Sequence, residues 1–306
     1  MKIYVFDYTN HAGKWIYSAY QKAWAEKGFE VCKIHNSQDI SEAVANTEEE
    51  YMLMIPDIAA NGTPNLEVVE KSHKTFLYVQ PNEFPHPWGT HPNFISLATE
   101  TTIEQINKFE NVRLWTFGDD TASYHIKWKE THSIPLAFDS IGYTCSINET
   151  YKKFDVCFIG GWANNGFNEK RKIMIDIFSK FKASGLKCAF FVEKNLTHEQ
   201  ETQLMSSSRV TLNIHDAYQR TLGTDTNERT FKSLGLNGCL VSDTVGQLNR
   251  IFPELKTSLD AQEIVEITKQ YVSLSDRELN DLKEKNIQNI LENHCYTNRV
   301  ESLLKL

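Results

Sequence analysis

The feature that most constrains the fold is an alternation of short apolar segments with longer amphipathic ones, which occurs twice. In the first half, strands are predicted at residues 3–6, 29–34, 51–55, 75–79, 95–98 and 112–117, with helices at 14–27, 41–45, 66–72 and 101–109. In the second half, strands are predicted at 156–159, 188–192, 210–214 and 240–241, with helices at 169–183, 198–206, 228–236, 261–272, 276–292 and 296–304. Strands separated by helices form parallel sheets that bind ligands beyond the carboxyl ends of their strands.

The length of 306 residues favours two domains, because a single core seldom grows beyond ~250–300 residues. We expect an α/β protein with two Rossmann-like, doubly wound domains facing across a cleft, the architecture called GT-B. The predicted boundaries are an N-terminal Rossmann-like domain at 1–140, a linker at 141–153, a C-terminal Rossmann-like domain at 154–290 and a closing helix at 291–306.

Charge and cysteine usage exclude several classes of protein. Residues 1–150 carry 11 Lys and Arg against 20 Asp and Glu, whereas residues 151–306 carry 21 against 20. An acidic first half argues against a broad grip on a polyanion. Six widely spaced cysteines without a CxxC pair predict reduced thiols in a cytoplasmic protein and argue against a zinc site. No apolar run approaches the ~18–20 residues of a membrane span.

Two junctions in the second half predict a site for a small anion. In one, a polar loop precedes a helix that opens with Arg229. In the other, the strand at 156–159 ends in Gly160 and Gly161, and Arg171 lies at the start of the next helix. Exposed amides and the helix dipole favour phosphate at such positions, and guanidinium groups bind it in a bidentate manner. We expect Arg171 and Arg229 to converge on one diphosphate.

Residues of about 154–304 resemble the catalytic half of CgeB-like, group-1 glycosyltransferases. The resemblance rests on the glycine turn followed by arginine, the strand Leu212-Asn213-Ile214-His215, the motif of Arg229 and Phe231 followed by Gly238 and Asp243, and a terminal His294, Tyr296 and Arg299. A more distant likeness to phage DNA β-glucosyltransferases lies in the same two arginine motifs. Both resemblances imply the GT-B fold and a UDP-sugar donor, with no required cofactor.

The chain departs from the family three residues after Arg229. There the family carries a glutamate for the ribose hydroxyls, and this chain carries Lys232, which only donates hydrogen bonds. Either Glu228 or Asp225 binds the ribose instead, or Lys232 contacts phosphate. His215, at the end of its strand, is a candidate for contact with base or sugar, and an internally bonded structural histidine is the alternative. The stereochemical outcome stays open.

Candidates for the acceptor base lie in the first half, in loops after the strands. Glu83 and His86 follow the strand at 75–79, and Asp7 and His11 follow the first strand. A carboxylate or imidazole at either place is suited to take the proton of an acceptor hydroxyl. No convincing DxD motif stands in the donor half, so we predict no metal site, with helix dipoles and cationic side chains in its place.

These observations predict a metal-independent glycosyltransferase, a hexosyl- or pentosyltransferase, that uses a nucleoside-diphosphate sugar. The acceptor is a glycan, a lipid-linked precursor or a protein, with a modified, hydroxymethylated DNA base as the alternative. A non-catalytic nucleotide-sugar-binding module is the alternative from another class. A Rossmann dehydrogenase is excluded because no G-x-G-x-x-G follows a strand.

Overall fold

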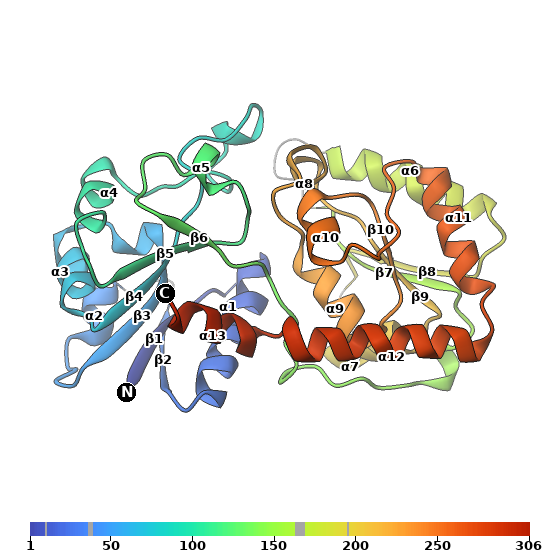
Figure 1. The fold of residues 1–306 in the computed structure, drawn as a ribbon, viewed down its shortest axis with the longest axis horizontal. Helices are drawn as coiled ribbons and strands as arrows, with labels where there is room; N and C mark the ends of the chain where they lie inside the picture. The colour runs from blue at the N-terminus through green and yellow to red at the C-terminus, as the bar shows by residue number, and fades with distance from the viewer. Residues whose placement is uncertain (10, 36–38, 163–168, 195) are drawn as a thin grey trace. The chain divides into compact units, whose positions relative to one another are not determined.

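The computed structural model describes residues 1–9, 11–35, 39–162, 169–194 and 196–306. The chain divides into two compact units. The first unit comprises Met1–Pro135 together with Tyr296–Leu306, and the second comprises Leu136–Cys295. Each unit is built around its own parallel sheet (Figure 1). The α/β fold class expected from the alternation is thereby confirmed.

The first unit contains a six-stranded sheet in the order β2-β1-β3-β4-β5-β6, with every pair parallel. Its strands are β1 Lys2–Asp7, β2 Glu30–His35, β3 Tyr51–Pro56, β4 Lys74–Tyr78, β5 Val112–Thr116 and β6 Thr131–Ser133. The chain winds outward in both directions from β1, so the strand order reverses between β1 and β3. Ligands of doubly wound sheets bind at such a switch point.

Helices cover this sheet and bury its apolar side chains. They are α1 His11–Glu26, α2 Ile40–Val44, α3 Thr63–Lys71, α4 Glu100–Ile106, α5 Thr121–Tyr124 and α13 Tyr296–Leu304, with 3₁₀ turns η1 Asp57–Ala60 and η2 Trp88–Thr90. In α1, Tyr20, Ala23 and Trp24 recur at helical spacing and are fully buried. Gly28, at a φ of 85°, follows the end of this helix, as its lack of a Cβ allows.

The second unit contains a four-stranded parallel sheet in the order β10-β9-β7-β8. Its strands are β7 Val156–Gly160, β8 Cys188–Val192, β9 Val210–Asn213 and β10 Leu240–Ser242. Its helices are α6 Glu169–Ala183, α7 His198–Ser207, α8 Ala217–Leu222, α9 Glu228–Leu236, α10 Gly246–Ile251, α11 Ala261–Val272 and α12 Asp276–Asn293, with a 3₁₀ turn η3 Glu149–Tyr151. Helix α6 packs beside α11, and α9 beside α12 (Figure 1). The switch point lies between β7 and β9.

One predicted strand, at residues 95–98, is wrong. Strands β4 and β5 pair directly, so the sheet has no position for another strand between them. The Ser96 amide instead donates to the Pro81 carbonyl at 2.7 Å, and the Ser96 hydroxyl donates to Asp57 at 2.7 Å. The segment is a loop fixed by these two bonds. Strand β6 and helices α8 and α10 are further elements that the sequence patterns did not predict.

The division into units differs from the predicted boundaries. Within the predicted linker at 141–153, Tyr143 is buried and the Asn148 amide donates to the Ser207 hydroxyl at 2.8 Å, so this segment packs on the second unit. The final helix, α13, packs against α1 of the first unit, with the rings of Tyr20 and Tyr296 4.8 Å apart. The chain therefore returns to the first unit after residue 295.

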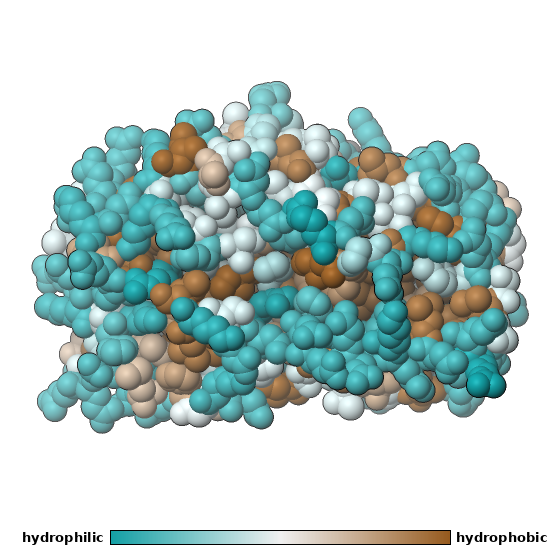
Figure 2. All heavy atoms as spheres, in the orientation of Figure 1, coloured by the Kyte–Doolittle hydropathy of each residue, from teal (hydrophilic) through white to brown (hydrophobic). Residues whose placement is uncertain are grey.

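The described residues include no helix long and apolar enough to cross a membrane. All six cysteines lie in the described ranges and are free thiols. On the face shown in Figure 2, hydrophilic side chains predominate and hydrophobic residues are interspersed among them.

Candidate functional site

The Arg229 side chain occupies the switch point of the second sheet. Helix α9 begins at Glu228, and the side chain of the preceding Asn227 caps it by accepting from the Thr230 amide at 3.3 Å. This start places Arg229 in the first turn. Its guanidinium lies 5.1 Å from the ring centre of Phe158 on β7, and Nη1 donates to Oδ1 of Asn213 on β9 at 3.2 Å. One cation thus touches both strands that flank the switch point.

The absence of a side chain at Gly160 leaves room for the Arg229 guanidinium. A Cβ built at Gly160 would lie 2.7 Å from Cζ of Arg229, a separation that real Cβ atoms do not show. At Gly161, the built Cβ is 3.6 Å from Cγ of Glu193, an ordinary contact. The two glycines therefore differ in their surroundings. Gly160 leaves room for the arginine, whereas Gly161 has no such neighbour.

Lys170, rather than Arg171, is the buried cation beside Arg229. Its ammonium lies 2.9 Å from Oδ1 of Asp216, and the residue is only 9% exposed. Burial lowers the pKa of Lys170, Asp216 raises it, and the positive charge of Arg229 lowers it further. Arg171 is exposed, with its guanidinium 4.9 Å from the ring centre of Trp162. Adjacent helical positions face different directions, so the expected pairing of Arg171 with Arg229 is not what the structure favours.

A sequence signal for Lys170 exists. The buried residues of α6 are Lys170, Met174, Ile177 and Phe181, which lie at intervals of four, three and four. This is the spacing of one helical face. Extending the apolar stripe backward from Phe181 reaches Lys170, not Arg171.

His215 is fully buried and makes no contact with solvent. It is 0% exposed, and both ring nitrogens have partners: Nδ1 lies 2.6 Å from Oδ1 of Asp243, and Nε2 lies 2.8 Å from the hydroxyl of Thr226. Burial alone would raise the pKa of Asp243, but interactions with His215, then the charge of Arg220, outweigh it and lower this pKa. The alternative of an internally bonded histidine describes this geometry better than direct ligand contact.

Two of the expected polar contacts are already bonded to protein groups. The Asp225 carboxylate accepts from Gln219 at 2.7 Å and from Tyr218 at 3.0 Å, and burial raises its pKa. The Lys232 ammonium lies between two carboxylates, 3.3 Å from Glu201 and 3.7 Å from Glu228. Lys232 therefore neutralises one carboxylate of α7 and one at the start of α9, and its charge is not free for a phosphate.

The acceptor candidates in the first unit fall into separate places. Glu83 and His86 are exposed in the loop after β4. Asp7 accepts from Nε2 of Gln21 at 3.0 Å at the end of β1. The His11 side chain lies outside the described residues. The predicted base candidates are thus not gathered into one cluster by the parts of the first unit that the structure describes.

Asp57 is a carboxylate that the sequence reasoning missed. It directly follows β3, on the other side of the switch point from β1, and is 3% exposed. Its Oδ2 accepts from the Ser96 hydroxyl at 2.7 Å and from the Gln80 amide at 3.2 Å. Burial raises its pKa above the usual range, against the effect of these bonds. An acid immediately after a buried strand was the available signal.

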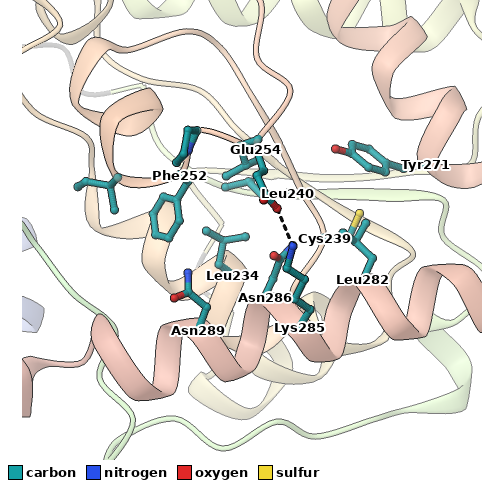
Figure 3. A pocket seen from close by; sticks show the side chains of 13 residues that line it. Leu234, Cys239, Leu240, Phe252, Glu254, Tyr271, Leu282, Lys285, Asn286 and Asn289 are labelled. Atoms are coloured by element: carbon teal, nitrogen blue, oxygen red, sulfur yellow. Dashed lines mark hydrogen bonds and ion pairs between the residues drawn. The ribbon is translucent and has the colours of Figure 1, made fainter.

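A pocket of about 360 Å³ lies elsewhere in the second unit. Leu234, Leu240 and Phe252 form its apolar wall, and an ion pair between Glu254 and Lys285, 2.7 Å apart, stands at its side (Figure 3). The pocket adjoins the first residue of β10, whereas the switch point is at the opposite, carboxyl ends of the strands. It is therefore separate from the Arg229 site. Within the described ranges, no group of three or more His, Cys, Asp or Glu side chains is placed to hold a metal ion.

The chain is similar to known proteins in one family model and in several solved structures. Residues 167–305 match a protein-family model described as glycosyl transferase-like. The fold is similar to T4 phage BGT in complex with UDP and Mn²⁺, with 14% identity, full coverage of both chains and a TM-score of 0.55. It is also similar to S. aureus MnaA with UDP, with 10% identity, coverage of 100% and 96%, and a TM-score of 0.53.

A third similar structure is an α,α-trehalose-phosphate synthase (UDP-forming) from Burkholderia vietnamiensis, with 7% identity, coverage of 87% and 74%, and a TM-score of 0.53. No curated protein sequence matches the chain. Likenesses at these identities establish the fold, which is GT-B. The family match covers residues 167–305, so the glycosyl transferase-like assignment belongs to that part of a chain whose fold is GT-B.

Proposed function

We propose that this protein transfers a sugar from a UDP-sugar to an acceptor hydroxyl, with the diphosphate bound at the switch point between β7 and β9. The observation that carries the proposal is the Arg229 guanidinium, which lies against Gly160 at the carboxyl ends of two parallel strands. This is where doubly wound sheets bind ligands. Lys170 supplies a second cation close by.

The chemistry follows from these charges. The bond between the anomeric carbon and the diphosphate oxygen breaks, the acceptor oxygen forms the new bond, and its proton passes to a base. Negative charge grows on the departing UDP, so fixed cations stabilise the transition state more than the ground state. Arg229 and Lys170 are held by Asn213 and Asp216 before the donor arrives, and such preorganised groups need little rearrangement during the reaction.

For the ribose we propose Glu228, which adjoins Arg229 in the first turn of α9. Its carboxylate can accept from hydroxyls, and Lys232 holds it at 3.7 Å. Lys232 thereby orients the group that takes the place of the family's glutamate. Gly160 and Gly161 form the turn that approaches the donor. Asp225 and His215 hold neighbouring protein groups in place through the hydrogen bonds described above.

For the acceptor base we propose Asp57, ahead of Glu83, His86, Asp7 and His11. Asp57 flanks the switch point of the first sheet, and its pKa is raised, as suits a general base near neutral pH. The acceptor class we propose is a glycan, a lipid-linked precursor or a protein. A modified DNA base is the alternative, favoured by the full-length likeness to T4 phage BGT and opposed by the acidic first half.

The motifs quoted for the CgeB-like group support placing the chain near that group. A transfer without a metal cofactor is also part of the proposal, because Arg229 and Lys170 supply positive charge where a metal would otherwise act.

Calorimetric titration with UDP and UDP-sugars tests the donor site. We expect the wild type to bind UDP and to gain about 2.7 kcal/mol of stability when the UDP concentration is one hundred times Kd. We also expect it to hydrolyse UDP-sugars slowly when no acceptor is present. Arg229→Ala should weaken UDP binding by at least ~10-fold, because a charge-assisted contact is lost. Arg277→Ala, at an exposed position of α12, is the matched control.

Three outcomes separate the alternatives. Binding of UDP without turnover over a broad acceptor panel would favour the non-catalytic module. Retention of duplex DNA that weakens with salt would favour the DNA acceptor. Absence of UDP binding, or equal affinity in the wild type and Arg229→Ala, would contradict the assigned site.

A further inference from the structure

The hydrogen bonds of Asn213 fix the direction in which its amide points. Arg229 has only donors, so the atom of Asn213 that faces its Nη1 at 3.2 Å must be the carbonyl oxygen Oδ1. The amide nitrogen Nδ2 then points to the other side. There it lies 3.0 Å from the Thr230 hydroxyl and 3.3 Å from Nε2 of His215.

The protons of His215 are fixed by the same reasoning. Nδ1 lies 2.6 Å from the Asp243 carboxylate, which also accepts from the His215 backbone amide at 3.0 Å. An ionised carboxylate only accepts, so Nδ1 carries the proton. In the neutral ring Nε2 is therefore an acceptor, and it faces two groups that can donate to it, the Thr226 hydroxyl and the Asn213 amide.

These groups have no solvent to replace a lost partner. Asn213, His215, Thr226, Thr230 and Asp243 are each 0% exposed. A buried group that loses its hydrogen bond bears a cost that a solvated group does not. The orientation of each member consequently depends on its neighbours.

We infer that His215 is a positioning residue for Arg229: as an acceptor at Nε2, it keeps the Asn213 amide turned so that Oδ1 holds the guanidinium against Gly160. Without an acceptor at this position, the Asn213 amide would lose the partner that fixes its direction. It could then turn over, present N–H groups to Arg229 and release it. The inference rests on the proposed function, because it concerns the same diphosphate site.

The charged groups around His215 come from several elements. Asp243 follows β10, Arg220 of α8 lies 3.6 Å from Asp243, and Asp225 interacts electrostatically with His215 from the loop before α9. Lys170 of α6 and Arg229 of α9 interact with Asp243. Asp243 stays an ionised acceptor in this setting, since its pKa is lowered. Nδ1 therefore keeps its proton, and Nε2 is the acceptor that faces the Asn213 amide.

Two substitutions separate the ring nitrogens of His215. His215→Asn retains a donor near the position of Nδ1 and removes Nε2, whereas His215→Gln places an amide oxygen near the position of Nε2. We expect His215→Asn to weaken UDP binding by ~10-fold and His215→Gln to restore most of that loss. His198→Asn, at an exposed histidine of α7, is the control and should bind UDP like the wild type.

A double-mutant cycle with Arg229→Ala shows whether His215 acts through the arginine. In the Arg229→Ala background, His215→Asn should change the UDP affinity by less than ~2-fold, because the guanidinium that it positions is gone. Equal losses in both backgrounds, or equal losses for Asn and Gln at position 215, would overturn the inference and leave the donor site standing. A wild type that does not bind UDP would overturn the proposed function and this inference with it.

If His215→Asn does not fold, His215→Gln provides the test. We expect it to bind UDP within ~3-fold of the wild type, and a loss of ~10-fold or more would overturn the inference.

Discussion

The Arg229 guanidinium fills the space that a side chain at position 160 would need: a Cβ built at Gly160 would lie 2.7 Å from Cζ of Arg229. The contact joins the end of β7 to the first turn of α9. It makes the glycine turn and the arginine helix one structural unit, although about seventy residues separate them in the chain.

Gly160→Ala should therefore displace the arginine. We expect UDP affinity to fall by ~10-fold, with both the charge and the fold retained, as measured by calorimetry and circular dichroism. Gly161→Ala is the comparison within the same turn and should cost less affinity, because its Cβ meets only the Glu193 side chain, at 3.6 Å or more, and not the arginine. Equal affinities for the two alanine variants would show that the contact does not matter for the donor.

Lys170→Met and Arg171→Met distinguish the two adjacent cations of α6. The Lys170 variant should lower UDP affinity by ~10-fold and also lower the melting temperature, because Asp216 loses its buried partner. The Arg171 variant removes an exposed cation and should change neither strongly. The reverse order of effects on affinity would restore the arginine pair expected from the motif.

Lys232→Met should destabilise the second unit in a pH-dependent way. Burial raises the pKa of Glu228 above its ordinary 4.5, even with Lys232 lowering it. Without the lysine, the folded state favours protonated Glu228, so stability is fully present below that ordinary value and is lost as pH rises through the higher folded value. We expect a loss of about 3 kcal/mol at pH 7 in urea unfolding, typical of breaking a buried pair, and a much smaller loss near pH 4.

The control for this experiment is Lys285→Met, which removes an exposed ion pair with Glu254 and should leave the unfolding midpoint unchanged at both pH values. A loss for Lys232→Met that is the same at pH 7 and pH 4 would show that packing of the lysine stem, not its charge, is responsible.

Asp57→Asn should separate chemistry from donor binding. If Asp57 takes the acceptor proton, turnover of UDP-sugar should fall by ~100-fold or more, while the UDP affinity measured by calorimetry stays unchanged. The wild-type rate should rise with pH as the carboxyl loses its proton, and its raised pKa moves that rise toward neutrality. Asp7→Asn is the matched control; a larger loss there would transfer the role to the end of β1.

Treatment with EDTA should leave UDP binding and sugar release unchanged, because Arg229 and Lys170 supply the positive charge at the diphosphate. The measurement is the rate before and after chelation and gel filtration. Loss of activity with recovery on adding Mn²⁺ would contradict this proposal, and Mn²⁺ is present in one similar structure of T4 phage BGT.

Local patterns predicted the four strands and most of the longer helices of the second unit closely, but missed the short helices α8 and α10. Helices α6, α9 and α11 begin and end at the predicted residues, because each has a continuous apolar stripe, and α9 and α11 also have a capping side chain just before their first residue. The strand predicted at residues 95–98 failed because an apolar run does not reveal whether the sheet has a free neighbour for it. That depends on the direct pairing of β4 with β5.

The sequence by itself determined the class of fold and the position of Arg229, since strand and helix periods and caps are properties of neighbouring residues. Only the tertiary structure decided that Lys170 rather than Arg171 lies beside it, that Lys232 is bound between Glu201 and Glu228, and that His215 is enclosed with Asp243. Those choices depend on which groups from distant segments share a buried space, where every charge and hydrogen-bonding atom needs a partner.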